Sequence, residues 1–514
     1  MSGGGGVVWP GPGLLWVYWV GSAFLWLGLS WVVAWRWRLP QKPGPAVVLG
    51  LAVGVRVGYA VLMPPTLSDD IWRYLWDGRT LSAGMNPYAE APAEALARLR
   101  AEGVGSGEGA DEGGGSAEDR ERWQLLTRIN HPELVTIYQP TSQWFFAGVV
   151  TSHDWVTGWG RKAASGGLAR GLVEADGVGD AESEVERDGG GEGKEAEALA
   201  RWFRLALVLV DVPIILLLMR QLRELGRSVW WSVLYAWSPL AITEVAWSGH
   251  QDGVGILFLM GALMLGQRAG RGRGAWWCGG GAGVLLALSA GVKPIVLPLA
   301  LPMAWKLWCD AGPGRRRWAL GRIGVSAAAC VAALALLYLP FMWMEGGLSG
   351  MWETGRRFVS AWRFNGSVHR VLEAAAGGWA EPEVAKGFAD AGCGLLLAGV
   401  LGWASVGHRV PWRAAVTYLF AGVCLSSTAH PWYLLWALAL LPVAWSAGPT
   451  VVAWAVWVAS LTLGWSYAAY LRLAEGSGYT VGVAGGWAIW LPIGVALVYG
   501  VARVVGRRPG QRRG

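Results

Sequence analysis

Cysteine and histidine are scarce in this sequence. Its 514 residues include five cysteines and six histidines. The cysteines all fall in or beside apolar runs, without the C-x-x-C spacing of a zinc or redox site. We therefore expect small core residues at these positions, and neither a zinc centre nor a disulfide framework is indicated.

Charge is also scarce. Charged residues make up 15% of the chain, against 54% hydrophobic residues and 37 tryptophans, and the mean hydropathy is positive. A water-soluble enzyme of this size does not normally have such a composition. Apolar runs of roughly 20 residues, the length that crosses a bilayer, recur along most of the chain. We therefore expect a polytopic membrane protein.

Several motifs of other protein classes are absent. No G-x-G-x-x-G occurs in a strand-to-helix context, which argues against a domain for nucleotide sugars. No basic stretch is interleaved with aromatic residues, so nucleic acid is not an expected partner. No internal repeat is evident, which disfavours a transporter. The glycine-rich residues 1–13 lack the basic region of a signal peptide, so the first apolar run should remain as a membrane helix.

The apolar runs predict an all-α fold with about thirteen membrane-spanning helices. These helices are expected at residues 13–35, 46–63, 201–219, 229–247, 252–267, 275–291, 293–308, 319–343, 388–406, 411–427, 430–446, 449–470 and 483–504.

Basic residues cluster in the short connections between these helices and in the tail, residues 505–514. Such loops stay in the cytoplasm, and with the N-terminus outside they all fall on one side. The other side then receives the large loop 64–200, the loop 345–387, and the turns around His250 and His430. Chemistry in these segments is therefore expected on the extracytoplasmic side.

The large loop has two acidic, glycine-rich inserts, residues 94–122 and 158–200. They contain little that could be buried, so we expect both to be disordered. Between them, the apolar stretch 137–156 is expected to form a juxtamembrane helix that lies at the interface.

Polar residues are most concentrated at the start of this loop. Residues 68–79 read Ser-Asp-Asp-Ile-Trp-Arg-Tyr-Leu-Trp-Asp-Gly-Arg, and Asn-Pro-Tyr follows at 86–88. Because a carboxylate pair is costly in hydrocarbon, Asp69 and Asp70 should face water or a polar cavity at the bilayer surface. One carboxylate can act there as a base while nearby arginines hold an anionic group.

Further motifs follow in chain order, and with residues 68–79 they resemble the signature of GT-C glycosyltransferases. They are Thr136–Gln143, Ser248–Gly253, Lys293-Pro294, Phe364–Ser367 and His430–Trp436. The most similar subgroup is the bacterial polyprenyl-phosphate-mannose-dependent mannosyltransferases. The chain departs from their pattern at Gln139-Pro140, where Pro-Pro is usual, and in its two inserts.

The resemblance implies one GT-C-like transmembrane domain over residues 1–514. It also implies an inverting transfer of a hexose, with mannose favoured, from a polyprenyl-phosphate donor to a hydroxyl of a glycan, lipid or other acceptor. The family's base is a carboxylate in the first outer loop, which corresponds here to Asp69 or Asp70, and we prefer Asp69. Alternatively, the pair only caps the helix that begins near Ile71.

Other residues of the first loop have two readings. Arg73 could bind the donor phosphate, since a guanidinium holds an oxyanion bidentately, or it could pair with Asp77 four residues further on. Asp77, Tyr138 and Gln143 are assigned to binding of the sugar or acceptor.

Three candidates lie in the next motifs. His250 and Asp252 should contact a sugar hydroxyl; they could instead ligate a divalent cation or complete a helix boundary, and no third metal ligand is identifiable. Lys293 lies between apolar runs, where a lysine is expected to bind an anion such as the donor phosphate. Its alternative is to reach the interface by snorkelling.

The last motifs supply Arg363 and His430 as donor phosphate ligands, and Asn365 and Tyr433 as sugar or acceptor ligands. The alternative for His430 is a hydrogen bond at a helix end. No cofactor is identified, and a divalent cation stays open.

These features favour a lipid-linked glycosyltransferase in the cytoplasmic membrane, surrounded by membrane lipids, with its site on the outer face. The alternative is a multi-pass transporter or flippase of a lipid-linked or anionic substrate, in which ionisable residues line a path through the bilayer. A third possibility is a catalytically inactive scaffold with the same fold.

Overall fold

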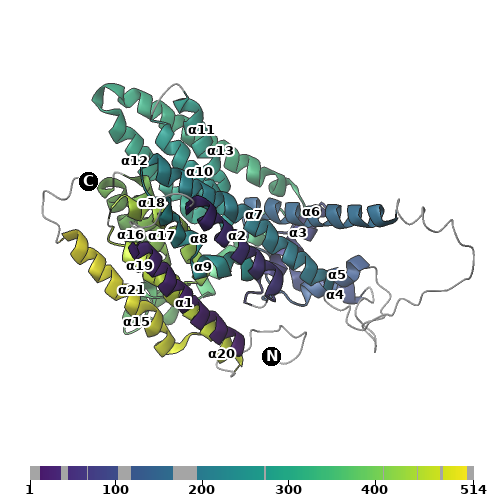
Figure 1. Cartoon of the computed structure of the whole chain (residues 1–514). Helices are drawn as coiled ribbons and strands as arrows, with labels where there is room; N and C mark the ends of the chain where they lie inside the picture. The colour runs from purple at the N-terminus through teal and green to yellow at the C-terminus, as the bar shows by residue number, and fades with distance from the viewer. Residues whose placement is uncertain are drawn as a thin grey trace, which may run out of the picture. The chain divides into compact units, whose positions relative to one another are not determined.

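The computed structural model describes residues 12–35, 44–65, 67–101, 117–165, 194–270, 274–408, 410–448, 450–474 and 479–505. Within these ranges the regular structure is helical (Figure 1), apart from two isolated bridges that join Phe364 and Asn365 to Thr428. The predicted all-α class is therefore confirmed.

The chain forms two compact units. The described residues of Ser68–Ala206 and Pro340–Gly355 form the first, here called the loop unit. Those of Val8–Leu67, Leu207–Leu339 and Arg356–Gly514 form the second, the bundle unit.

The loop unit contains α3 (Asp70–Ser82), α4 (Pro92–Ala101), α5 (Ala117–Leu126), α6 (Pro140–Ser165) and the beginning of α7 (Lys194–Glu224). Helix α3 packs against α6, and Gly78 makes this close approach feasible. A Cβ atom at Gly78 would lie 2.7 Å from the carbonyl oxygen of Phe146. Tyr74 stacks on the Phe146 ring with 4.7 Å between centroids, so aromatic side chains form the core between these two helices.

The helices of the bundle unit are shared among the N-terminal, central and C-terminal parts of the chain. They are α1 (Pro12–Trp35), α2 (Gly44–Leu62), the rest of α7, η2 (Val229–Ser232), α8 (Val233–Ala236), α9 (Pro239–Ile242), η3 (Thr243–Trp247), α10 (Asp252–Arg268), α11 (Ala275–Ala290), η4 (Pro294–Leu299), α12 (Ala300–Ala311), η5 (Pro313–Arg315), α13 (Arg316–Trp343), α14 (Ser349–Ala361), α15 (Val368–Ala376), α16 (Pro382–Gly407), α17 (Pro411–Leu425), η6 (Pro431–Leu434), α18 (Leu435–Ser446), α19 (Ala453–Thr462), η7 (Leu463–Tyr467), α20 (Ala468–Ala474) and α21 (Gly482–Val505). The last four residues of α13 and the first seven of α14 belong to the loop unit.

Long apolar helices indicate a multi-pass membrane protein. Five described helices are long and apolar enough to cross a bilayer: Gly44–Leu62, Glu195–Glu224, Pro313–Trp343, Pro382–Gly407 and Gly482–Val505. Shorter apolar helices cover Leu15–Leu29, Ala275–Ala290 and Pro431–Ser446. The long helices carry apolar side chains that are largely exposed, such as Leu336, Leu395 and Val498. Lipid, rather than water, is the suitable solvent for such surfaces.

Proline interrupts several helices that we predicted to be continuous. The prediction of one continuous helix over residues 229–247 is wrong, because this segment consists of four short helices. Pro239 interrupts the segment, since it lacks a backbone N–H and clashes with the preceding turn. Its last piece, η3, is a π-helix. In the same way, Pro294 begins a 3₁₀ turn before α12 and Pro431 begins one before α18.

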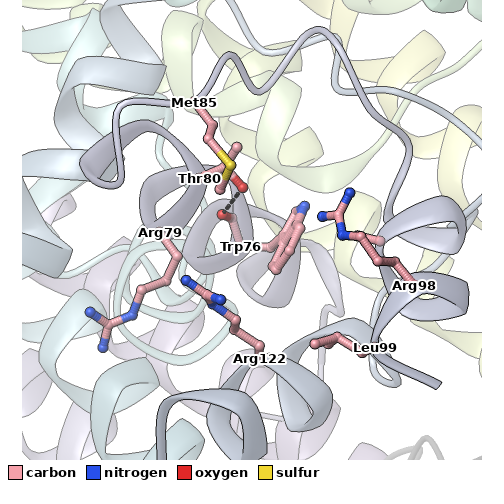
Figure 2. A pocket seen from close by; sticks show the side chains of 8 residues that line it. Trp76, Arg79, Thr80, Met85, Arg98, Leu99 and Arg122 are labelled. Carbon is pink, nitrogen blue, oxygen red and sulfur yellow. Dashed lines mark hydrogen bonds between the residues drawn. The ribbon is translucent and has the colours of Figure 1, made fainter. Parts of the chain in front are cut away.

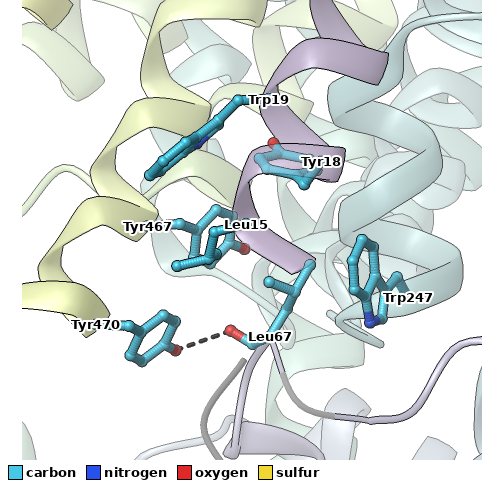
Figure 3. Close-up of a cluster of buried hydrophobic side chains, with 7 residues drawn as sticks. All are labelled: Leu15, Tyr18, Trp19, Leu67, Trp247, Tyr467 and Tyr470. Atoms are coloured by element: carbon cyan, nitrogen blue, oxygen red, sulfur yellow. Dashed lines mark hydrogen bonds between the residues drawn. The ribbon is translucent and has the colours of Figure 1, made fainter. Parts of the chain in front are cut away.

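An aromatic cluster joins the two ends of the bundle unit's chain (Figure 3). Tyr18 of α1 contacts the rings of Trp247 and Tyr467 edge to face. The hydroxyl of Tyr470 donates to the carbonyl of Leu67 at 2.8 Å. Buried aromatic pairs of this kind each stabilise packing by about 0.5–1.5 kcal/mol.

The two inserts are partly described. Helix α4 reaches residue 101 and α5 begins at residue 117, and both helices bury leucines, including Leu99 and Leu125. The predicted juxtamembrane helix 137–156 is α6, which begins at Pro140 and continues to Ser165. The disorder expected over residues 94–122 and 158–200 is therefore wrong for their described parts, residues 94–101, 117–122, 158–165 and 194–200, which are helical. Residues 102–116 and 166–193, and the basic tail beyond residue 505, lie outside the described residues.

Candidate functional site

The carboxylate pair lies at the N-terminus of α3. Both Asp69 and Asp70 are half-buried. Asp69 occupies the N-cap position, but its side chain makes no capping hydrogen bond. Its Oδ1 atom instead accepts a hydrogen bond of 2.8 Å from the Asn130 amide, and the Ser68 hydroxyl accepts from the backbone N–H of Asp70. N-capping alone therefore does not explain the position of the Asp69 side chain.

Arg73 holds the segment that carries Asn130. Its guanidinium donates to the carbonyl oxygens of Leu134 at 2.9 Å and His131 at 3.0 Å. The side chain is buried and is occupied by these backbone groups. This geometry suits a role for Arg73 in positioning the segment that carries Asn130. It suits the two predicted roles, a phosphate ligand or an ion pair with Asp77, less well.

Asp77 and Gln143 meet inside the loop unit, where both are buried. The Gln143 amide donates to Asp77 Oδ2 at 3.0 Å and to the carbonyl of Tyr138 at 3.3 Å. Tyr138 in turn packs edge to face on Tyr74. These contacts join α3 to α6, so the geometry gives the three predicted sugar ligands a structural role.

Burial has a direct electrostatic effect on Asp77. It raises the pKa of this carboxyl from 3.8 to about 6, although Arg73, Thr136 and Gln143 act in the opposite direction. Desolvation is the largest cause, because a carboxylate loses its water shell in the protein interior.

In the bundle unit, Lys293 forms an ion pair with Asp252. Its ammonium lies 4.3 Å from the centroid of the Tyr433 ring. The Trp436 indole donates to the same Asp252 carboxylate at 2.6 Å. Asp252 is buried, whereas the Lys293 side chain is 25% exposed. Lys293 can therefore meet a further anion, while Asp252 holds it in place.

His250 is fully buried beside a carboxylate that the sequence analysis missed. Its Nδ1 atom lies 2.9 Å from Glu244 of η3, and the Tyr467 hydroxyl donates to the same carboxylate at 2.9 Å. Gly249, with φ of +76°, allows the tight turn between η3 and α10. The full burial of His250 fits its pairing with Glu244 better than it fits the predicted contact with a sugar.

The His430 ring belongs to a continuous aromatic stack. His250 stacks on Trp432 with 3.8 Å between centroids, and Trp432 stacks on His430 at 4.2 Å. His430 then stacks on Phe364 at 4.7 Å. The stack connects three of the predicted site motifs within one unit.

The remaining candidates are near this stack in sequence. Arg363 is exposed and pairs with Glu373 at 2.8 Å. Asn365, with φ of +54°, accepts hydrogen bonds from the Trp490 indole and donates to the carbonyl of Ala429. Asn365 therefore stabilises the turn. Arg363 can bind a phosphate at the surface only if it releases Glu373.

Among the described residues, no group of three His, Cys, Asp or Glu side chains is arranged to hold a metal ion. His250 and Asp252, for which metal binding was one alternative, have separate partners in Glu244 and Lys293.

Three missed residues complete these contacts. Glu244 had a signal, because an acid inside an apolar run needs a partner. Trp436 lies within the recognised motif His430–Trp436, but its indole was given no role. Asn130 lies 61 residues from Asp69 in the chain, and no local pattern identifies it.

Comparison of the chain with models of known protein families and with curated proteins finds no match.

Proposed function

We propose that the protein is an inverting glycosyltransferase of the GT-C type that uses a polyprenyl-phosphate-linked hexose. The observation that carries this proposal is the half-buried carboxylate pair, with Asp69 oriented by Asn130 at 2.8 Å. The N-terminus of a helix is also a favourable place for negative charge. A carboxylate that is held but not capping is suited to accept a proton.

The reaction needs one base and one leaving group. Asp69 takes the proton of an acceptor hydroxyl while that oxygen forms a bond to the anomeric carbon of the donor sugar. The bond from this carbon to the phosphate oxygen breaks, and the polyprenyl phosphate leaves with the electron pair. A positioned base contributes about 10² to 10⁴-fold to such a step.

Lys293 is the residue that we assign to the donor phosphate. It is partly exposed, and Asp252 and the Tyr433 ring fix its ammonium. A lysine acts on phosphate as a point charge.

The finer assignments follow from the resemblance and the loop charges. We propose about thirteen membrane spans, a site on the extracytoplasmic face of the cytoplasmic membrane, and mannose as the sugar. The basic short connections support this orientation.

Transfer of label from radiolabelled polyprenyl-phosphate-mannose, and then from other lipid-linked hexoses, tests the proposal. Membranes would contain the wild type, the Asp69→Asn/Asp70→Asn double variant, or Asp310→Asn. Asp310 is an exposed aspartate paired with Lys306 and serves as the matched control. We expect transfer with the wild type and the control and none with the double variant. Equal transfer by all three would contradict the proposal.

A transporter or flippase is the second candidate, and one observation favours it. Arg56 and Asp211 form a fully buried ion pair at 2.6 Å within apolar helices, and ionisable groups in such places often mark substrate paths. Under this alternative, vesicles containing the protein would move a lipid-linked sugar between leaflets without transferring it to an acceptor, and the Asp69 and Asp70 variants would move it more slowly, because both residues would line the substrate path.

A further inference from the structure

Asp252 is a buried carboxylate in direct contact with Lys293, the residue assigned to the donor phosphate. Its side chain is 2% exposed. It is the first residue of α10, where the helix dipole favours a negative charge. Its Oδ1 atom accepts from the Lys293 ammonium and, at 2.6 Å, from the Trp436 indole. The ion pair therefore places a full negative charge beside the lysine.

Packing fixes this carboxylate in place. Gly255 lies three residues further along α10, and a Cβ atom at this position would overlap the Trp436 ring. The indole thus lies directly on the backbone of α10, which glycine makes feasible. The Ser289 hydroxyl donates to the Gly255 carbonyl at 2.8 Å. These contacts leave the Asp252 side chain little room to turn away from Lys293.

Lys293 keeps the capacity to bind a second anion. An ammonium group has three N–H donors, and one of them points to Asp252. The ammonium lies 4.3 Å from the centroid of the Tyr433 ring, and the side chain is 25% exposed. A phosphate oxygen can therefore reach a second N–H. Two oxygens that share one ammonium in this way lie roughly 4–5 Å apart.

Two cations of the loop unit are less available than Lys293. Figure 2 shows a pocket of about 140 Å³ between α3, α4 and α5, which Arg79 and Arg98 help to line. Glu121 binds the Arg79 guanidinium through two contacts of 2.7 and 2.9 Å. Glu90 binds Arg98 in the same way, at 2.6 and 3.1 Å. We therefore assign no anion to this pocket.

The donor and the product of the proposed transfer differ in charge. A polyprenyl-phosphate sugar is a phosphodiester with a single negative charge, whereas the polyprenyl phosphate that leaves is a monoester. The second pKa of a phosphate monoester is about 6, so its charge is about −1.5 to −2 at pH 7. A lysine alone would bind the more highly charged product more tightly. A carboxylate about 4–5 Å away opposes this preference, because at an effective dielectric constant of about 20 each further unit of charge costs more than tenfold in affinity.

We propose that Asp252 is a specificity-determining residue, which makes the Lys293 site favour the singly charged diester of the donor over the doubly charged monoester of the product. This inference rests on the proposed function. Asp252 acts on the phosphate through the charge that it places beside Lys293. The second charge of the phosphate is complete only when the bond to the sugar has broken, so the repulsion acts mainly on the bound product and favours its release.

Calorimetric titration of the full-length protein in lipid nanodiscs tests this proposal, with empty nanodiscs as the blank. The two ligands are farnesyl phosphate and its methyl diester, which has one charge as the donor has. At pH 8 the monoester is almost fully doubly charged. Both ligands meet the protein at the same pH, so the charges of the neighbouring Glu244, His250 and His430 are common to both titrations. The wild type should bind the diester at least as tightly as the monoester.

Asp252→Asn removes the charge and keeps the size of the side chain. It should raise the affinity for the monoester, relative to that for the diester, by about tenfold. Trp436→Phe is the matched control, because it removes the hydrogen bond to Asp252 but leaves the charge. It should leave the ratio of the two affinities unchanged, even if both ligands bind more weakly.

Three results would overturn the role of Asp252. They are a wild type that binds the monoester tenfold more tightly than the diester, an unchanged ratio in Asp252→Asn, and an equal change of the ratio in Trp436→Phe. The first of these needs no variant, so the proposal is tested even if Asp252→Asn does not fold. Transfer of sugar by the wild type together with any of these results would leave the proposed function intact. Binding of neither ligand, together with no transfer, would contradict both.

Discussion

The ion pair between Arg56 and Asp211 leads to a quantitative prediction about stability. Both side chains are fully buried, with 2.6 Å between Arg56 Nε and Asp211 Oδ2. Arg56 also donates to the carbonyl of Ala236 at 2.6 Å, and the Tyr235 hydroxyl donates to Asp211. The pair therefore joins α2 and α7 to the short helix α8.

Removal of one partner leaves the other as a buried charge without its counterion. From measured buried pairs, Asp211→Asn or Arg56→Met should each lower the free energy of unfolding by about 3–5 kcal/mol. The double variant Arg56→Met/Asp211→Leu replaces both charges with apolar groups, so it should be more stable than either single variant.

Equilibrium unfolding in mixed SDS micelles would measure these differences. Asp310→Asn, which breaks the exposed pair with Lys306, should change stability by less than about 1 kcal/mol. Two results would contradict the reasoning. One is that Asp211→Asn lowers the free energy of unfolding no more than this control does. The other is that the double variant lowers it by as much as the two single variants together.

Three further outcomes are expected. The pKa of Asp77 is about 6 in the folded state and 3.8 in the unfolded state, so the folded state binds the proton more tightly. The free energy of unfolding, relative to that of Asp77→Asn, should therefore rise by up to about 3 kcal/mol as the pH falls from above 6 to below 4. No change of this difference with pH would contradict the burial argument. Asn130→Leu should lower the maximal transfer rate about tenfold with little change in KM, since it removes the hydrogen bond with which Asn130 orients the Asp69 carboxylate, and unchanged kinetics would remove the orienting role. Gly78→Ala should lower the free energy of unfolding by about 1–3 kcal/mol, because its Cβ atom would clash with the backbone of α6. Gly148→Ala, whose Cβ atom would have open space, should leave the free energy of unfolding unchanged or raise it.

Most of the helices could be predicted from their apolar runs. The expected helix 46–63 is α2, Gly44–Leu62, and the expected helix 388–406 is α16, Pro382–Gly407. Both runs are long and uninterrupted by an internal proline. The region 229–247 could not be predicted as well, because its composition is equally apolar and only Pro239 and tertiary packing decide where the pieces end.

The site was predictable only in part. The position of Asp69 and Asp70 at the start of α3 follows from local sequence, and so does the concentration of polar groups there. The partners do not: Arg73 binds carbonyl groups of residues 130–134 instead of the carboxylate one turn away. Contacts across more than 50 residues, such as that of Asn130 with Asp69, depend on how the chain folds back and leave no local pattern.

The transfer rate of the separate variants Asp69→Asn and Asp70→Asn tests the central claim most directly. With a lipid-linked hexose as donor, Asp69→Asn should lose about 10² to 10⁴-fold in rate while it keeps its fold and its affinity for the donor. A comparable loss for Asp70→Asn alone would move the base to the neighbouring residue. Wild-type rates in both variants would contradict the account of this protein as a carboxylate-dependent glycosyltransferase.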